Sequence, residues 1–376
     1  MNQVVVRIGN IFDSRVQTLV NTVNCVGVMG KGIALEFRKR FSDMFQDYVL
    51  RCSKGEVQLG RPYLYTRLVS PRILNFPTKY HWRDVSRVSN ITAGLAYLES
   101  HYRQWGITSM AMPPLGCGNG ELDWNVVGPT LYDYLARLDI PVELYAPFGT
   151  PVDKLEPRFL KGRGTTIPIH PNRAAEIRVQ PGAVALAAIL SRIHREPYHS
   201  RIGRVTFQKI AYFATEAGIP TGLKYRRGSF GPFSEDVKRL TARLINNDLV
   251  RETSSGKMYL IQPGETYRTA RDVYREQLIE WRSKIERVAD LFLRLPNTTM
   301  AEVSATAHYA AGDLERKLDR KVTELDVVDA VMEWKRRRRP PLDRTLVAHA
   351  TRYLNALGWV SLEPSKGIET GELATA

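Results

Sequence analysis

Short apolar runs alternate with helical patterns over the first 150 residues. Residues 4–8 and 18–22 are mainly apolar, which is typical of buried strands. Ile33, Phe37 and Phe41 recur every four residues and predict a helix with one buried face. The same reasoning predicts further strands at 63–66, 73–76, 109–112 and 142–146, and helices at 88–102 and 124–138. This alternation predicts an α/β fold in which a mixed sheet lies between helices.

Two glycine-rich loops follow two of these strands. Gly27, Gly30 and Gly32 lie between a strand and a helix, and the loop 113–121 follows the strand at 109–112. Glycine lets the backbone approach a ligand closely, and amides at a helix start attract anions. Ligands of such sheets lie outside the carboxyl ends of the strands, so both loops are expected at one crevice. Each loop alone also fits a plain helix-capping turn, and neither has P-loop or dinucleotide-fingerprint spacing.

A mainly helical domain is expected over residues 183–376, after a linker at 151–182 that is rich in proline, glycine and charge. Helices are predicted at 183–193, 207–217, 237–244, 274–293 and 346–357, a β-hairpin at 249–252 and 257–261, and a short strand at 358–362. Ser234 is the expected cap of the helix at 237–244, after a loop at 226–235. The polar tail from Glu363 is expected to fray. Two helices followed by a hairpin predict a winged-helix-like domain.

Composition and charge narrow the class of protein. Of the net charge of +15 in 376 residues, +11 falls within 151–376, where 38 Lys and Arg oppose 27 Asp and Glu. A basic chain favours polyanions such as nucleic acid, although a solvated basic surface gives the same count. No apolar run reaches the roughly 20 residues of a membrane span, and the first residues lack a signal-peptide layout. Cys25, Cys52 and Cys117 show no metal spacing, so we expect a cytoplasmic protein without metal or cofactor.

Three motifs stand in an order found in macrodomains: Gly9-Asn10-Ile11, Asn21-Thr22-Val23-Asn24, and the loop from Pro114 to Gly120. Residues 1–150 therefore resemble that family. The resemblance implies that this domain binds ADP-ribose, with adenine at the first motif and the distal ribose and phosphates at the glycine loops. The implied binding residues are Asn10, Ile11, Asn21, Val23, Asn24, Gly30, Lys31, Gly32, Ile33, Thr78, Gly116, Cys117, Gly118, Asn119, Gly120 and Glu121. Asn10 replaces the aspartate that is usual in the family.

Within this family, residues 29–34 and 75–79 resemble the branch that contains the terminal ADP-ribose glycohydrolase and the DarG-like antitoxins. In that branch a lysine is catalytic, and it corresponds here to Lys79. A lysine can act as a base or as an amine nucleophile, whereas the alternative is a surface charge after a strand. The glycohydrolase has an aspartate where this chain has Gly120. Glu121 or Asp123 could replace it, and Asp123 could equally be only a helix cap.

The second domain has two motifs, at residues 207–214 and 225–234, that resemble SocA-like antitoxin domains. In DarG-like chains such a domain binds a DarT-like DNA ADP-ribosyltransferase toxin, which implies this partner for residues 183–376. The basic run 335–339 either contacts phosphates or is the basic end of a helix. The expected function is an antitoxin that removes ADP-ribose from thymine in DNA and sequesters the toxin. The alternatives are an ADP-ribose reader fused to a DNA-binding module, and a hydrolase of ADP-ribosylated protein carboxylates.

Overall fold

The computed structural model describes residues 4–67, 69–162, 179–256 and 258–365. The chain divides into two compact units, at Met1–Glu176 and Ile177–Ala376, and each is described by itself. Within the described residues, no helix is long and apolar enough to cross a membrane. Most of the expected linker, from residue 163 to residue 178, and the tail from residue 366 lie outside the described residues.

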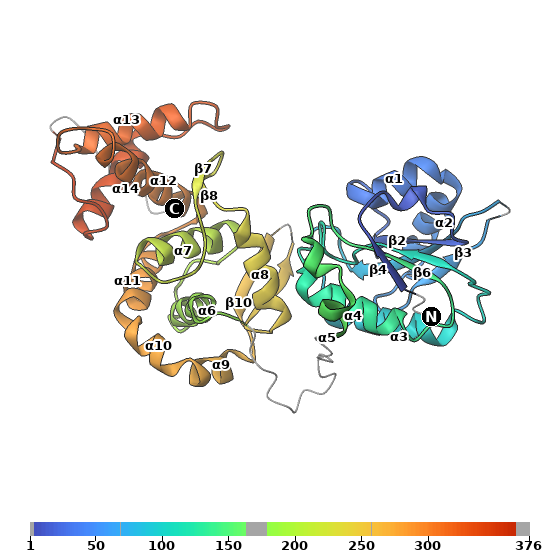
Figure 1. Ribbon diagram of the computed structural model, residues 1–376. Helices are drawn as coiled ribbons and strands as arrows, with labels where there is room; N and C mark the ends of the chain where they lie inside the picture. The colour runs from blue at the N-terminus through green and yellow to red at the C-terminus, as the bar shows by residue number, and fades with distance from the viewer. Residues whose placement is uncertain (1–3, 68, 163–178, 257, 366–376) are drawn as a thin grey trace. The chain divides into compact units, whose positions relative to one another are not determined.

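Unit 1 is built on a six-stranded mixed sheet (Figure 1). The strands are β1 (Val4–Arg7), β2 (Thr18–Asn24), β3 (Tyr63–Tyr65), β4 (Arg72–Lys79), β5 (Met110–Met112) and β6 (Val142–Tyr145). They lie in the order β1-β6-β5-β2-β4-β3, and only β3 runs antiparallel to its neighbour. The predicted strands are confirmed, and β4 extends the apolar run at 73–76 to the lysine at its end.

Helices cover both faces of this sheet, as the alternating pattern predicted. Two separate apolar cores lie on the two sides: α3 (Val88–His101) and α4 (Trp124–Leu135) contribute to one, and α1 (Gly32–Arg40) and α2 (Ser42–Ser53) to the other. Asp123 caps α4 by accepting a hydrogen bond from the Asn125 amide at 2.9 Å, which confirms its predicted role as a cap. The short helices η1 (Ile11–Asp13), η2 (Val152–Lys154) and α5 (Pro157–Gly162) complete the described part of the unit.

Unit 2 is mostly helical, as expected. Its elements are α6 (Pro181–His194), α7 (Arg204–Glu216), β7 (Arg226–Gly228), β8 (Gly231–Phe233), α8 (Asp236–Asn246), β9 (Val250–Ser255), β10 (Met258–Pro263), α9 (Tyr267–Val273), α10 (Arg275–Glu280), α11 (Arg282–Leu293), α12 (Thr298–Glu315), α13 (Glu324–Trp334) and α14 (Arg344–Ala356). The predicted hairpin is present as antiparallel β9 and β10. Two helices and a hairpin follow in the predicted order, and their winged-helix arrangement stays a prediction.

Two predictions around residue 230 were wrong. The expected loop at 226–235 is a tight hairpin, because Gly231 adopts a φ of +87° and lets β7 and β8 pair across two residues. Ser234 is not the cap of α8, since the cap position falls on Glu235 and the Ser234 side chain is buried.

Two further predictions were wrong nearer the C-terminus. The long helix expected at 274–293 is broken into α10 and α11 at Trp281, which is buried and has a non-helical ψ of 10°. The segment 358–362 forms no strand, because Trp359 packs against the ring of Phe213 at a centroid distance of 4.9 Å instead of extending along a sheet.

Candidate active site

Three loops of unit 1 leave the sheet at one edge. The parallel strands β5, β2 and β4 are neighbours and end at Met112, Asn24 and Lys79 (Figure 1). The loops 25–31, 80–87 and 113–122 therefore begin side by side, at the carboxyl ends where α/β sheets bind ligands. The first and third are the two glycine loops, so the expectation that both reach one edge is confirmed.

The two glycine loops also face each other directly. A Cβ atom added to Gly32 would lie 3.1 Å from Nδ2 of Asn119, and Gly32 has a φ of +58°. Gly32 is the first residue of α1, whose cap residue Lys31 makes no side-chain cap bond. The start of α1 therefore lies against the second loop, and the dipole and first N–H groups of a helix favour an anion near such a start.

Lys79 lies where these loops meet. Its side chain is buried, and the residue is only 9% exposed. Nζ donates one hydrogen bond to the carbonyl of Asn119 at 2.6 Å and another to the carbonyl of Asp84 at 2.9 Å. Lys79 also pairs with Asn24 across β2 and β4. The reading of Lys79 as a surface charge is wrong, because its amine connects the second glycine loop to the loop after β4.

Asn24 shapes the first glycine loop. Its Oδ1 accepts hydrogen bonds from the amides of Val26 at 3.0 Å and Val28 at 3.3 Å, and its Nδ2 donates to the Val28 carbonyl. The hydroxyl of Tyr48, on α2, donates to the carbonyl of Asn24 at 2.9 Å and lies 3.0 Å from Oδ1. The side chain of Asn24 thus fixes the backbone that a ligand would meet. Sequence reasoning missed Tyr48, because it did not predict α2.

Asn21, Val23 and Thr78 lie one layer further inside. Asn21 is fully buried and donates from Nδ2 to Oδ1 of Asn75 at 2.9 Å, and Asn75 in turn donates to the hydroxyl of Tyr63 at 3.0 Å. Val23 and Thr78 are each 3% exposed. These buried side chains support the strand ends from which the loops begin.

The second glycine loop is closely packed at Gly120. A Cβ atom there would lie 2.4 Å from Oγ of Ser86 and 2.5 Å from the Gly116 carbonyl. A larger residue such as aspartate cannot occupy this position in the same backbone. Of the two carboxylates that could replace it, Asp123 is used as the cap of α4. Glu121 follows directly, half-buried and with a φ of +61°. Gly118 and Asn119 are exposed at the loop surface.

Asn10 and Ile11 lie at the end of β1, three strands away from β2 in the sheet order. Asn10 caps η1: its Oδ1 accepts from the Phe12 amide at 3.2 Å, and its Nδ2 donates to Asp13 at 3.2 Å. Ile11 is buried. The predicted site residues therefore form an elongated row along the carboxyl edge, with Asn10 at one end and Lys79 near the other.

The cysteines near these loops are poor nucleophiles. Burial raises the pKa of the Cys117 thiol and of the Cys25 thiol to about 12 each, so both stay protonated at neutral pH. Within the described residues, no three His, Cys, Asp or Glu side chains gather as a metal site would require. Lys79 therefore remains the candidate for a reactive side chain beside these loops.

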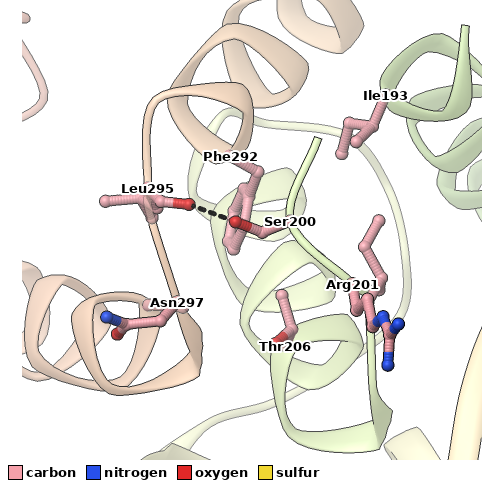
Figure 2. Close-up of a pocket in the computed structure, with 9 residues that line it drawn as sticks. Ile193, Ser200, Arg201, Thr206, Phe292, Leu295 and Asn297 are labelled. Atoms are coloured by element: carbon pink, nitrogen blue, oxygen red, sulfur yellow. Dashed lines mark hydrogen bonds between the residues drawn. The ribbon is translucent and has the colours of Figure 1, made fainter. Parts of the chain in front are cut away.

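Unit 2 has a hollow of a different kind (Figure 2). It is lined mainly by apolar side chains, among them Ile193, Phe292 and Leu295, and its empty volume, open solvent included, is about 280 Å³. Ser200 donates to the carbonyl of Leu295 at 3.1 Å and to that of Pro296 at 2.8 Å. Its hydroxyl is thus used in joining two segments of the unit, and we assign no chemistry to the hollow.

Comparison with known proteins places these features in a family. Residues 20–131 match the Macro domain family. The chain is 40% identical over 241 residues to a DNA ADP-ribosyl glycohydrolase of Thermus aquaticus, covering 63% of this chain and 62% of that relative. It is 36% identical over 274 residues to a DNA ADP-ribosyl glycohydrolase of Mycobacterium tuberculosis, covering 66% of this chain and 73% of that relative.

A third relative joins two activities in its name. It is a DNA ADP-ribosyl transferase-DNA ADP-ribosyl glycohydrolase fusion protein of Thermosipho africanus, 40% identical over 172 residues, which cover 40% of this chain and 44% of that relative. The chain thus spans less than two thirds of the Thermus and Thermosipho relatives. Unit 1 holds 176 of the 376 residues, so an alignment over 63% or 66% of the chain also includes part of unit 2.

Proposed function

This chain belongs to the family of DNA ADP-ribosyl glycohydrolases, and on that premise we propose that unit 1 hydrolyses the N-glycosidic bond between ADP-ribose and a thymine base of DNA. The observation that carries the proposal is the place of Lys79. Its buried amine donates to the Asn119 carbonyl of the second glycine loop, and that loop lies against Gly32 at the start of α1. Glycine loops and helix starts are favourable places for an anion. A diphosphate in the loops would bring the distal ribose next to that amine.

The proposed ligand follows the row of residues along the carboxyl edge of the sheet. Adenine would lie at Asn10 and Ile11, the diphosphate between residues 116–121 and the start of α1, and the distal ribose at Asn24. The length of this row supports a ligand with several consecutive groups. The exposed residues Gly118 and Asn119 and the start of α1, which has no side-chain cap, support the phosphate positions.

The proposed reaction breaks the bond between the anomeric carbon and the thymine nitrogen. The bonding electron pair goes to the thymine nitrogen, which takes up a proton, while the anomeric carbon gains oxygen from water. Lys79 can serve this reaction as a base for that water or as an amine that attacks the carbon first and is released by water. Both roles require the amine within about 3–3.5 Å of the reacting atoms, a requirement that its burial among the loops supports.

Hydrolysis of two substrates tests the reaction. A single-stranded oligonucleotide with one ADP-ribosylated thymine should lose its ADP-ribose and return to the unmodified mass. A peptide ADP-ribosylated on glutamate should react more slowly per enzyme by at least tenfold. Mass spectrometry of both reactions distinguishes them. If neither substrate loses ADP-ribose although the protein binds free ADP-ribose, the chain is a reader; if the peptide is preferred, it is a protein hydrolase.

We propose a second function for unit 2, which is to bind and neutralise a DarT-like DNA ADP-ribosyltransferase toxin. Three findings support it. The similarity to glycohydrolases extends into unit 2, and the name of the Thermosipho relative joins both activities in one chain. A third is the exposed hairpin of β7 and β8. Phe230 at its tip is 66% exposed, and Arg226 and Arg227 are exposed on β7. Exposed aromatics with arginine are enriched at the centres of protein interfaces.

Donors from α7, from α13 and from the residue after α13 fix this hairpin in position. The indole of Trp334 donates to the Gly228 carbonyl at 3.1 Å, Lys335 to that of Ser229 at 2.8 Å, and Lys209 to that of Pro232 at 3.0 Å. Lys335, the first residue of the basic run, is also paired with buried Glu302 at 2.7 Å. The amine of Lys335 is thus used within the unit, which supports the reading of residues 335–339 as the basic end of a helix. A rigid hairpin that presents Phe230 loses little entropy on binding a partner.

A further inference from the structure

The chain makes a tight turn directly after Lys79. The amide of Asp84 donates to the carbonyl of His81 at 2.9 Å, and the amide of His81 donates to Oδ2 of Asp84 at 2.8 Å. The amide of Arg83 also donates to Nδ1 of His81 at 3.2 Å. These bonds close a turn with Trp82 and Arg83 at its two central positions. We call residues 80–84 the aromatic turn.

The aromatic turn exposes two large rings. Tyr80 is 62% exposed and Trp82 is 44% exposed. The guanidinium of Arg83 lies 4.5 Å from the centroid of the Trp82 ring, and the ring of His81 lies 5.2 Å from it. Folding gains little from apolar rings left in water, and the turn is already closed by its own backbone and by Asp84. The rings are therefore available to a partner.

The same turn is tied to the candidate active site. Lys79 donates from Nζ to the carbonyl of Asp84, and the amide of Cys25, in the first glycine loop, donates to the carbonyl of Tyr80 at 2.8 Å. Trp82 is three residues from Lys79, so their Cα atoms are at most about 11 Å apart. The turn therefore lies within reach of nucleotides that directly flank a base held at Lys79.

We propose that Tyr80, Trp82 and Arg83 bind single-stranded DNA next to the ADP-ribosylated thymine. The flanking bases stack on the two rings, and Arg83, with the exposed Arg87 at the end of the same loop, contacts the phosphates. A strand rather than a duplex is the occupant, because base faces are accessible only when bases are unstacked from each other. This inference rests on the function proposed for unit 1 and adds how the enzyme recognises the DNA around the modified base.

Two substrates with the same scissile bond separate this contact from the chemistry. One is ADP-ribosylated thymidine alone, and the other is a single-stranded oligonucleotide with one ADP-ribosylated thymine. Trp82→Ala in the full chain should raise KM for the oligonucleotide at least fivefold, since a base stacked on an aromatic ring is held that strongly. It should leave kcat/KM for the nucleoside within twofold. Trp82→Phe, which keeps a ring, should restore most of the lost KM.

A matched control comes from the opposite edge of the sheet. Trp105 precedes β5 and, like Trp82, has a histidine ring nearby, His101 at 5.5 Å. Trp105→Ala should leave KM and kcat/KM for both substrates unchanged. Melting curves of all variants ensure that only folded proteins are compared. If the wild type cleaves both substrates and Trp82→Ala and Tyr80→Ala change neither, the stacking inference is overturned while the glycohydrolase stands. If the wild type cleaves neither, the proposed function itself fails.

Discussion

At the scale of single residues, the position of one amine decides most of the proposed chemistry. The side chain of Lys79 is buried at the end of β4, and its amine donates hydrogen bonds to the backbone carbonyls of Asp84 and Asn119. Both carbonyls lie in loops at the carboxyl edge of the sheet, so these bonds hold the amine at that edge. This position suits the proposed role of an amine that must stay close to a ribose between the two glycine loops.

Removing that amine should abolish the reaction without unfolding the protein. We expect Lys79→Ala to lower the rate of ADP-ribose release from the modified oligonucleotide by about 10²–10⁴-fold, the usual contribution of a positioned acid–base group. Single-turnover assays measure this rate. Lys54→Ala, which removes an exposed lysine at the end of α2, serves as the control and should keep full activity. A Lys79→Ala variant that retains most of its rate would exclude Lys79 as the catalytic group.

Two glycines of the second loop should respond differently to alanine. A Cβ on Gly120 would overlap Ser86 and Gly116, whereas a Cβ on Gly118 would have no neighbour within 4 Å. We expect Gly120→Ala to cost about 1–3 kcal/mol, as overpacking does. For a unit of this size, Tm falls by about 2–4 °C per kcal/mol. Gly118→Ala should leave Tm unchanged. Equal melting temperatures for the two variants would contradict the packing described at Gly120.

Part of the site could be predicted residue by residue, and part could not. Lys79 and the glycine loops stand in motifs of fixed spacing, so the sequence identified them. The Asn119 carbonyl that accepts from Lys79 and the Ser86 side chain that packs on Gly120 have no such signature, because any residue supplies a carbonyl and a serine is common in loops. Their roles follow only from the path of the backbone.

At the scale of elements, helix α2 shows how a segment outside the motifs can control the site. Its buried residues Met44 and Tyr48 are spaced by four, as in any amphipathic helix. Only the fold shows that the hydroxyl of Tyr48 reaches the carbonyl of Asn24. The same limit applies to the hairpin of β7 and β8, since three-residue strands are too short to show a period of two.

Tyr48→Phe tests this link between α2 and the first glycine loop. The variant keeps the ring and removes the hydroxyl, so we expect a loss of about 0.5–1.5 kcal/mol in unfolding free energy, the usual value of one hydrogen bond. It should also weaken ADP-ribose binding, which isothermal titration calorimetry measures. Tyr65→Phe removes an exposed hydroxyl on β3 and provides the comparison. Unchanged binding in Tyr48→Phe would show that the loop holds its shape without α2.

Helix α7 carries a buried lysine that should make the stability of unit 2 depend on pH. Burial, and secondarily the charge of Lys335, lower the pKa of Lys209 to about 8. The unfolded chain keeps that proton up to about pH 10.4. Unfolding therefore takes up a proton between pH 8 and pH 10, and the contribution of Lys209 to the unfolding free energy rises with pH over that window.

Urea denaturation of the wild type and of Lys209→Met at pH 8 and pH 10 measures this contribution. We expect the unfolding free energy of the wild type, minus that of Lys209→Met, to be larger at pH 10. Titrating groups remote from Lys209 are shared by the two proteins and cancel in this difference. A difference that is equal at both pH values, or that falls, would contradict a lowered pKa for Lys209.

At the scale of the whole molecule, the order of predicted elements gave the α/β class of unit 1 and the helical character of unit 2. The prediction from element order was wrong where tertiary packing determines the local structure. The helix expected at 274–293 is interrupted at Trp281, and the segment at 358–362 packs through Trp359. Amphipathic periodicity continues through such positions, so it does not reveal a break.

The two proposed functions should be separable in the intact chain. In cells that express the toxin, the full-length Lys79→Ala variant should still restore growth, because unit 2 would bind the toxin without hydrolysis. Adding Phe230→Ala should abolish the rescue and weaken the complex about 30-fold or more, the effect of losing a hot spot of at least 2 kcal/mol. Rescue and co-purification measure the two effects. If Lys79→Ala alone gives no rescue, unit 2 does not neutralise the toxin.

The order of strands in unit 1 sets a length that the ligand must match. From β1, which ends near Asn10, to β4, which ends at Lys79, the sheet has four interstrand spacings. At about 4.8 Å each, these amount to about 19 Å. AMP or ribose phosphate can occupy only one end of such a row. An intact ADP-ribose would reach both ends, and linking the two contacts in one molecule would raise its affinity. The width of the sheet thus supports the proposal that the complete ADP-ribose binds, rather than either fragment, even though both fragments carry phosphate charge.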